Sequence, residues 1–336
     1  MLQKIFFVFS FLLFAFLSSA QREMKPHVSI IFDSDMGPDY DDAGAITMLH
    51  AFADRGEAKI LATIASTKYP GVAAVMNVFN TYYHRSMLPV AVPKGKALDL
   101  RDFQHWTDTL IAKYPHKLKS NAEVPDAVEL YRKILAAQPD RSVTIVTVGF
   151  LTNVSNLLLS KGDKYSKLNG VELVKRKVDK LVCMAGGFPS GNEFNVNRDA
   201  AASQNTFNNW PTPVLLSGFE IGKKVKVGLP LIRNNGIHTP AKDVFRISIP
   251  MAAEDSAGRM SWDETAVLVA VRGYESWYKV KKGKIIVADD GSNTWEDDDN
   301  GNHSYLIETV PPSQVQELIN ELIMHDRFKT VFRKSK

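Results

Sequence analysis

The sequence predicts an α/β protein whose central sheet is mostly parallel and is flanked by helices on both faces. Short apolar runs, often β-branched, alternate with segments whose apolar residues recur at helical spacing. An acid-rich loop directly follows the first apolar run, and parallel sheets bind ligands beyond the carboxyl ends of their strands. After Gly218 the alternation weakens, and the pattern there favours an antiparallel ribbon at the C-terminal end.

The alternation assigns elements in order along the chain. Residues 28–32 have the continuous apolar character of a strand that is buried on both faces. Further strands are expected at 59–65, 89–92, 143–148, 180–185 and 214–216. Helices are expected at 43–53, 72–83, 124–137, 151–159, 199–209 and 264–272. Residues 277–307 would form the ribbon, with an acidic tip at 296–299, and Pro312 would open a last helix.

Composition places the chain among ordinary globular proteins. It has 336 residues, of which 45% are hydrophobic and 23% charged, so disorder and collagen-like repeats are excluded. A net charge of +4 over this length does not indicate nucleic-acid binding. The single cysteine, Cys183, excludes an intrachain disulfide framework and a cysteine-based zinc site. No internal repeat or long linker interrupts the chain, so residues 21–336 are expected to form one domain.

The first twenty residues have the pattern of a secretory signal peptide. Lys4 is their only charge, an apolar stretch follows, and small residues precede the expected mature start at Gln21. The apolar stretch is shorter than the roughly 20 residues that a membrane span needs, although an uncleaved anchor is the alternative. The mature protein is therefore expected to be secreted or periplasmic, with no membrane contact.

The densest chemistry lies at residues 33–42, which read Asp-Ser-Asp-Met-Gly-Pro-Asp-Tyr-Asp-Asp. Helix capping accounts for one or two of these acids. Five carboxylates in ten residues raise one another's pKa unless a cation neutralises them. Oxygen ligands favour a hard ion such as calcium or magnesium, and Gly37 allows the tight return that such a loop needs. The loop is therefore expected to be a metal or catalytic site.

This loop resembles the N-terminal signature of the inosine-uridine preferring nucleoside hydrolase family, in the longer form that exported bacterial-type members have. Two residues more than in the best-known members precede the paired acids Asp41 and Asp42. Three further blocks match in order and extend the resemblance from Val28 to about Gly273. They lie at 148–153, at 184–187 with 192–195, and at 261–263.

The resemblance implies a nucleoside hydrolase fold with a Rossmann-like core, and an N-glycosyl hydrolase activity. The enzyme would split ribonucleosides, or related N-ribosides, into free base and ribose, as in purine and pyrimidine salvage. Ca²⁺ would be held by the side chains of Asp35, Asp42 and Asp263 and by the carbonyl of Val148. Asp35 would be the catalytic base, taking the proton of a calcium-bound water.

The resemblance also assigns the substrate contacts. They would come from Asp41, Asn192, Glu193, Asn195 and Trp262. Asp33 would orient the acid-rich loop without touching the substrate. The partner is a small nucleoside rather than a nucleic acid or a membrane, and a homo-oligomer is compatible with this interpretation.

One departure from the family concerns the leaving group. The best-known members have a histidine, a candidate acid for the departing base, where this chain has Trp262. Tryptophan stacks on a base but cannot donate a proton to it. The leaving group must then depart readily, or its proton must come from elsewhere, for example from His84 or His238.

Two other functions are open at this level. In a haloacid-dehalogenase-like phosphatase, Asp33 would be the nucleophile and Mg²⁺ the cofactor, but Asp42 and Asp263 would have no role. In a non-catalytic exported sugar- or nucleoside-binding protein, the ion would remain and turnover would be lost.

Overall fold

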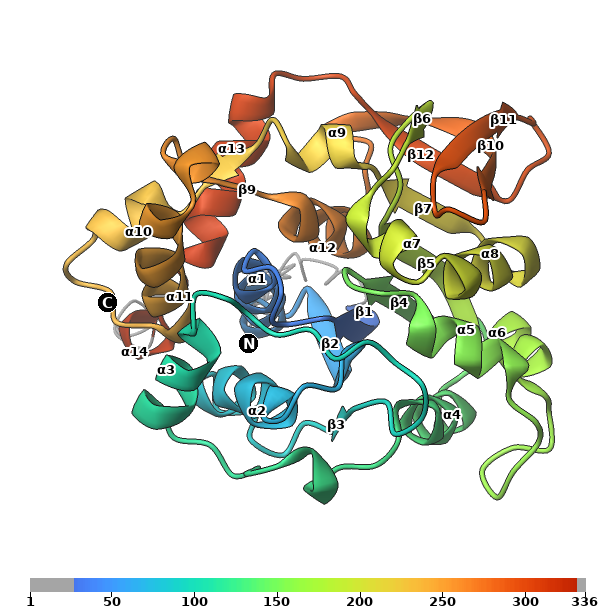
Figure 1. The fold of residues 1–336 in the computed structure, drawn as a ribbon, viewed down its shortest axis with the longest axis horizontal. Coiled ribbons are helices and arrows are strands. Elements are labelled where there is room, and N and C mark those ends of the chain that lie inside the picture. Colours follow the sequence, from blue (N-terminus) through green and yellow to red (C-terminus); the bar gives the residue numbers. More distant parts are fainter. Residues whose placement is uncertain (1–26, 331–336) are drawn as a thin grey trace, which may run out of the picture.

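A ten-stranded sheet runs through the molecule, in the strand order β3-β2-β1-β4-β5-β7-β12-β10-β11-β6 (Figure 1). The computed structural model describes residues 27–330, so the expected signal peptide lies outside the described residues. The strands are β1 (Val28–Ser34), β2 (Ala58–Ala65), β3 (Val90–Ala91), β4 (Val143–Thr147), β5 (Val178–Met184), β6 (Ser190–Gly191), β7 (Val214–Ser217), β10 (Tyr278–Val287), β11 (Asn293–Asp297) and β12 (His303–Glu308). A separate antiparallel pair joins β8 (Lys226–Val227) to β9 (Arg259–Met260).

The sheet is parallel from β3 through β12 and antiparallel beyond it. This confirms the predicted fold class. The C-terminal ribbon is antiparallel as expected, but it is not a separate layer. One edge of β12 pairs with β10 and the other pairs in parallel with β7, so the ribbon extends the central sheet. The local sequence pattern predicts a hairpin, but it does not predict which of the hairpin strands pairs with a strand of the central sheet.

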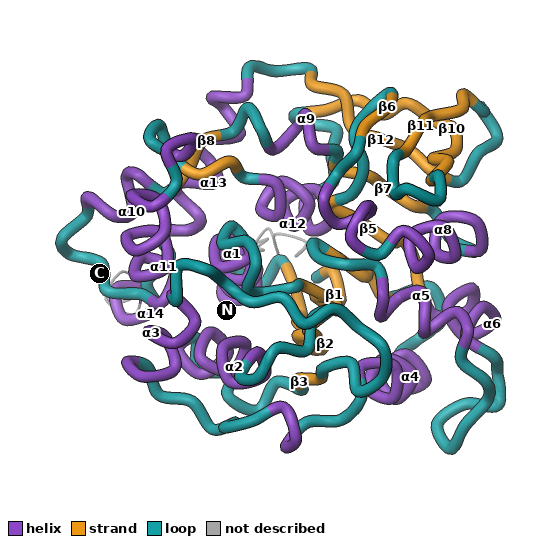
Figure 2. The backbone as a smooth tube through the Cα atoms, viewed as in Figure 1, coloured by secondary structure: helices purple, strands orange, loops and turns teal. Residues whose placement is uncertain are grey.

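Helices cover both faces of this sheet (Figure 2). Along β1, Ile30 and Phe32 face one buried cluster and Ile31 faces the other, because neighbouring side chains of a strand point in opposite directions. The first cluster contains side chains from α1 (Asp42–Asp54), α2 (Val72–Tyr82), α3 (Trp106–Lys113), α10 (Leu229–Arg233), α11 (Pro240–Ser248), α12 (Trp262–Arg272) and α13 (Pro312–Ile323). The second contains side chains from α4 (Ala127–Ala137), α5 (Thr152–Leu159), α6 (Gly170–Lys177), α7 (Phe194–Arg198) and α8 (Ala200–Asn209).

The expected elements lie within a few residues of their predicted bounds. One clear difference is α4, which begins at Ala127 rather than 124 because the Asp126 side chain accepts hydrogen bonds from Val128 and Glu129 and so caps the helix. Several short helices were not predicted, among them α3, α6, α9 (Phe219–Gly222) and α14 (Arg327–Thr330). A capping box at Asn169 and Glu172 was the available signal for α6. No described helix is long and apolar enough to cross a membrane.

The carboxyl ends of β1, β4 and β5 lie side by side, because these strands are neighbours and run parallel. The segments that leave them carry the acid-rich loop, the 148–153 block and the 184–195 block. Three motifs that lie far apart in the chain are thereby collected at one edge of the sheet.

Candidate active site

The acid-rich loop leaves β1 at Ser34 and enters α1 at Asp42 in a tight return. The backbone N–H of Met36 donates to Asp42 at 3.1 Å, and the Ser34 hydroxyl donates to the same carboxylate oxygen. The Tyr69 hydroxyl donates to the carbonyl of Met36 at 2.7 Å. A β-carbon on Gly37 would lie 2.7 Å from the Tyr69 ring, so only glycine fits at this close approach. The loop is thus held by its own side chains and by Tyr69.

Three acidic side chains, two of them from this loop, form a buried cluster. Asp35, Asp42 and Asp263 are each at most 4% exposed, although Asp263 lies more than two hundred residues from the other two. Burial raises the pKa of Asp35, and the charge of Asp42 raises it further. Burial likewise raises the pKa of Asp263, followed by the charges of Asp41, Asp42 and Asp35. The fold therefore places these carboxylates together in a buried site, where their negative charges repel one another.

The donor chemistry of this cluster fits a hard cation. Asp35 Oδ2 and Asp42 Oδ2 are buried and have no hydrogen-bond partner. Unpaired carboxylate oxygens in a buried site are costly unless a cation neutralises them, and oxygen donors suit calcium. Within residues 27–330, no group of three or more His, Cys, Asp or Glu side chains by itself forms an arrangement that could hold a metal ion. A bound ion would therefore also need backbone carbonyl, substrate or water oxygens.

The 148–153 and 184–195 blocks supply the neighbouring wall. The Asn195 amide donates to the carbonyl of Val148 at 3.1 Å and to the carbonyl of Met184 at 3.2 Å, which ties the segments after β4 and β5 together. Both oxygens of Glu193 accept backbone N–H groups, at Gly186, Asn195 and Val196, so this carboxylate caps α7. Burial nevertheless raises the pKa of Glu193 to about 7.

Arg259, which was not predicted as a site residue, is the positively charged side chain that pairs with the acid-rich loop. It lies on β9, is 7% exposed, and donates to Asp41 Oδ1 through Nε at 3.2 Å and Nη2 at 2.8 Å. It also pairs with Asp39 and, at 3.4 Å, with Asp255. Its guanidinium lies 4.3 Å from the centre of the Tyr40 ring. Arg259 therefore fastens the longer acid-rich loop to the segment that precedes α12.

Two adjoining cavities open above the carboxylate cluster. The inner cavity, of about 80 Å³, lies directly on the cluster. The outer cavity, of about 210 Å³, shares Asp39 and Phe194 with it. The inner cavity is lined by Asp35, Asp39, Val148, Met184, Glu193, Phe194, Asn195, Phe219, Trp262 and Asp263.

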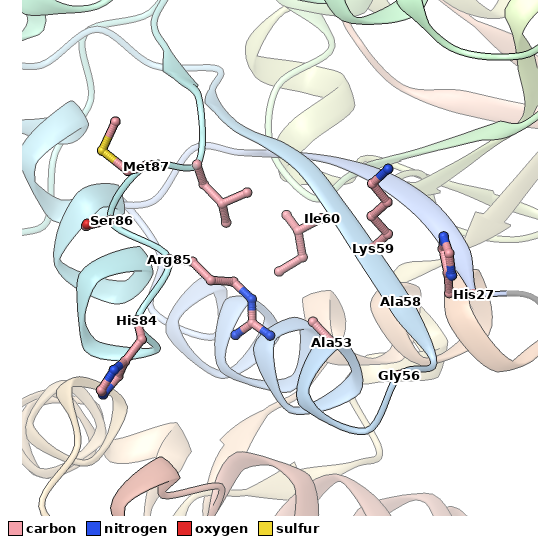
Figure 3. Close-up of a pocket in the computed structure, with 11 residues that line it drawn as sticks. His27, Ala53, Gly56, Ala58, Lys59, Ile60, His84, Arg85, Ser86 and Met87 are labelled. Atoms are coloured by element: carbon pink, nitrogen blue, oxygen red, sulfur yellow. The ribbon is translucent and has the colours of Figure 1, made fainter.

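A larger hollow of about 600 Å³ lies at the other end of the strands, beside the amino ends of β1 and β2. Figure 3 shows side chains around it from the amino end of β2, the end of α1 and the turn after α2. Its polar side chains are His27, Lys59, His84, Arg85 and Ser86. It contains no carboxylate and no buried unpartnered side chain, so size alone does not identify the reactive site.

Six of the ten predicted site residues line the inner cavity, and four do not. Asp41 has both oxygens occupied, one by Arg259 and the other by the backbone N–H groups of Trp262 and Asp263 at 3.0 and 3.1 Å. Asn192 is exposed and lies outside the cavity lining. Asp42 lies below the cavity, within the carboxylate cluster.

Asp33 also lies outside the cavity, where it was expected to support the loop. Its Oδ2 accepts hydrogen bonds from the Tyr131 hydroxyl at 2.8 Å and the Asn153 amide at 3.0 Å. A carboxylate buried in this way is not presented to a phosphate, which argues against the phosphatase alternative. Burial raises the pKa of Asp33 to about 7.

Trp262 forms a wall of the inner cavity with Phe219. The two rings stack with centres 5.2 Å apart, and the indole N–H donates to the carbonyl of Phe219 at 2.8 Å. His84 lies at the 600 Å³ hollow, and neither His84 nor His238 lines the inner or outer cavity. These histidines are therefore not placed to protonate a leaving group there.

The chain is similar to known proteins over most of its length. The family model described as inosine-uridine preferring nucleoside hydrolase matches residues 30–315. The pyrimidine-specific ribonucleoside hydrolase RihA of Shewanella sp. (strain MR-7) is 27% identical over 209 residues, which span 59% of this chain and 61% of that relative. The chain thus matches about three fifths of the relative's length.

Solved structures share the fold at low sequence identity. A plant nucleoside hydrolase, PpNRh1, aligns with a TM-score of 0.69 and 20% identity, over 89% of this chain and 99% of that one. The inosine-uridine preferring nucleoside hydrolase from Bacillus anthracis aligns with a TM-score of 0.69 and 13% identity, over 88% and 99%.

Replacing Arg259 by methionine is expected to destabilise the protein by about 3–5 kcal/mol, because it leaves buried carboxylates without their cation. Urea unfolding of Arg259→Met would measure the loss, with Arg259→Lys, which keeps the charge, expected to lie between it and the wild type. Adding Asp41→Asn to Arg259→Met should restore part of the stability. Wild-type stability in Arg259→Met would contradict this role.

Stability of the chelator-treated protein is expected to fall as pH rises from 4 to 8. The pKa of Asp33 is about 7 in the folded protein against an ordinary 3.8, so its protonated form favours folding below pH 4 and that contribution is lost as pH rises through 7. Thermal unfolding at stepped pH values measures the slope. In Asp33→Asn, which keeps the shape and cannot titrate, the slope should be shallower; an identical slope would exclude Asp33 as a source.

Proposed function

The chain belongs to the inosine-uridine preferring nucleoside hydrolase family, and from this we propose that it hydrolyses the N-glycosidic bond of ribonucleosides to free base and ribose. The observation that carries the proposal is the meeting of Asp35, Asp42 and Asp263 below a cavity that Glu193 and Asn195 also line. Buried acids with raised pKa values beside a cavity are typical of catalytic sites.

We propose Ca²⁺ as the cofactor, held by the side chains of Asp35, Asp42 and Asp263 and by the carbonyl of Val148. The unpartnered oxygens of Asp35 and Asp42 support this assignment. When bound, the ion would neutralise the cluster and make a nearby water more acidic. It would also bring the pKa of these carboxylates down, because an adjacent positive charge favours their ionised form.

The protein's own groups would then act on the water and the sugar. Asp35, which lines the inner cavity, would accept the proton of the attacking water. Asn195, whose amide is fixed by the carbonyls of Val148 and Met184, would orient the ribose relative to the attacking water. As the C–N bond breaks, positive charge develops on the sugar, and the surrounding carboxylates would stabilise it.

The base would leave without help from a histidine. No histidine lines the inner or outer cavity within the described residues, and the aromatic pair of Trp262 and Phe219 offers a stacking surface. The reaction would therefore depend on how well the leaving group carries negative charge. The relative named RihA is pyrimidine-specific and the Bacillus anthracis structure is named inosine-uridine preferring, so both base classes belong in the assay.

Hydrolysis of a nucleoside panel, with and without added Ca²⁺, tests the function. Asp35→Asn is expected to fold and to lower kcat by at least about a thousandfold, because it removes the proposed base and a cation ligand together. Asp42→Ala should lose turnover and also weaken Ca²⁺ binding measured by calorimetry. Near-normal turnover in Asp35→Asn would move the base elsewhere. Unchanged Ca²⁺ affinity in Asp42→Ala would contradict the proposed ligand set.

A series of ribosides with graded leaving groups tests the unassisted departure of the base. We expect kcat/KM to rise steeply as leaving-group pKa falls, so nitrophenyl or nicotinamide-like ribosides should react faster than inosine. A flat relation would show that a proton donor reaches the base or that bond cleavage is not rate-limiting. Binding of nucleosides without any turnover would favour the non-catalytic alternative.

A further inference from the structure

The inner cavity is the smaller of the two cavities beside the carboxylate cluster. Its volume is about 80 Å³, and its polar lining is the carboxylate and amide set that suits a sugar and a cation. The outer cavity, about 210 Å³, adjoins it through Asp39 and Phe194. A group bonded to a sugar in the inner cavity can extend across this shared border into the outer one.

The outer cavity is lined by a buried amide whose oxygen has no hydrogen-bond partner. Gln104 is 7% exposed, lines this cavity, and its Oε1 has no hydrogen-bond partner. A buried amide oxygen normally has a partner, because an unpaired one has lost its hydrogen bonds to water without replacement. An amide that lines a cavity beside a reactive site and has an unpaired oxygen is a candidate ligand contact, which a small side-chain rotation would present to the cavity.

The backbone around Gln104 is fixed independently of any ligand. Asp102, two residues earlier, accepts hydrogen bonds from the backbone N–H and the hydroxyl of Thr107 at 3.0 and 2.5 Å. His105, the next residue, has a left-handed φ of 56° and turns the chain into α3. Gln104 is therefore held at the cavity by the turn on either side of it.

Aromatic side chains line the same cavity, together with Pro38, Ala252 and the charged residues Asp39, Glu254 and Arg259. Phe103 is 64% exposed and Phe194 is 40% exposed, although phenylalanine normally lies inside a protein. Tyr40 closes the cavity from the longer acid-rich loop, with its hydroxyl bonded to Asp255. Exposed aromatic rings around a cavity provide stacking surfaces for a planar ligand.

We propose that the outer cavity holds the base of the nucleoside and that Gln104 is a specificity-determining residue, which hydrogen-bonds the polar edge of that base. This inference rests on the proposed function. A carboxamide presents one donor and one acceptor side by side. It complements a ring edge with an N–H next to a carbonyl, as in uracil and hypoxanthine, and after an amide flip it complements an amino group next to a ring nitrogen.

Substitution of Gln104 tests this role against substrates that have or lack such an edge. Gln104→Met keeps the length and removes both hydrogen-bonding groups. We expect it to lower kcat/KM for uridine and inosine about 10- to 100-fold, since a bidentate contact to a base contributes about that much discrimination. Hydrolysis of 4-nitrophenyl riboside, whose leaving group has no such edge, should change less than about twofold.

A second variant tests whether the preference between two bases changes in the expected direction. Gln104→Glu offers acceptors only, so it should favour cytidine over uridine relative to the wild type, because cytosine presents an amino group where uracil presents a carbonyl. The same methionine substitution at Gln314, exposed on α13, is the matched control and should leave all rates unchanged. Thermal unfolding of each variant confirms that it is folded.

The outcomes separate this proposal from the proposed function. An equal fall for uridine, inosine and nitrophenyl riboside in Gln104→Met, or no change for any of them, would overturn the role of Gln104 while leaving the hydrolase intact. If the wild type hydrolyses none of these substrates, the function fails. Calorimetric titration with free uracil and hypoxanthine then decides: weaker binding in Gln104→Met than in the wild type supports the base site, and equal or absent binding overturns it.

Discussion

Mutual repulsion between buried carboxylates is the constraint on which the rest of this site depends. Asp35, Asp42 and Asp263 lie together out of water, and burial raises the pKa of each. Neighbouring negative charges raise the pKa of Asp35 and Asp263 further. Within the cluster, Asp42 is held by the hydroxyl of Ser34 and the backbone N–H of Met36. A cation bound at the cluster would be attracted to all three carboxylates and would relieve their mutual repulsion. An arrangement that destabilises the cation-free protein would therefore favour cation binding.

Arg259 shows how the protein compensates for part of that repulsion on its own. It is bonded to Asp41, pairs with Asp39 and Asp255, and is carried by β9. The longer acid-rich loop would otherwise place two more carboxylates next to the cluster. The guanidinium pairs with both Asp41 and Asp39, and Asp39 borders both cavities. Arg259, rather than the proposed cation, thus neutralises these loop carboxylates.

The two halves of the proposed substrate site are built differently. The sugar side is formed where β1, β4 and β5 end, and its groups are fixed by backbone contacts such as those of Glu193 and Asn195. The base side is formed by loops, from Tyr40, Phe103 and Gln104. Loops vary more readily than the strands that support them. In the proposed site, the sugar side is thus carried by the sheet edge and the base side by loops.

Local sequence was enough to define the fold class, most strands and helices, and the acid-rich loop, because these depend on periodicity and on residues that are close in the chain. It also indicated Asp263, but only through resemblance to a family, since nothing local distinguishes that residue from a helix cap. The folded chain was needed to show that Asp41 is bound by Arg259, that β12 joins β7, and that Gln104 lines a cavity with its oxygen unpaired. Each of these depends on segments distant in the chain, and such contacts are chosen by the packing of the whole sheet and its helices, which no local pattern encodes.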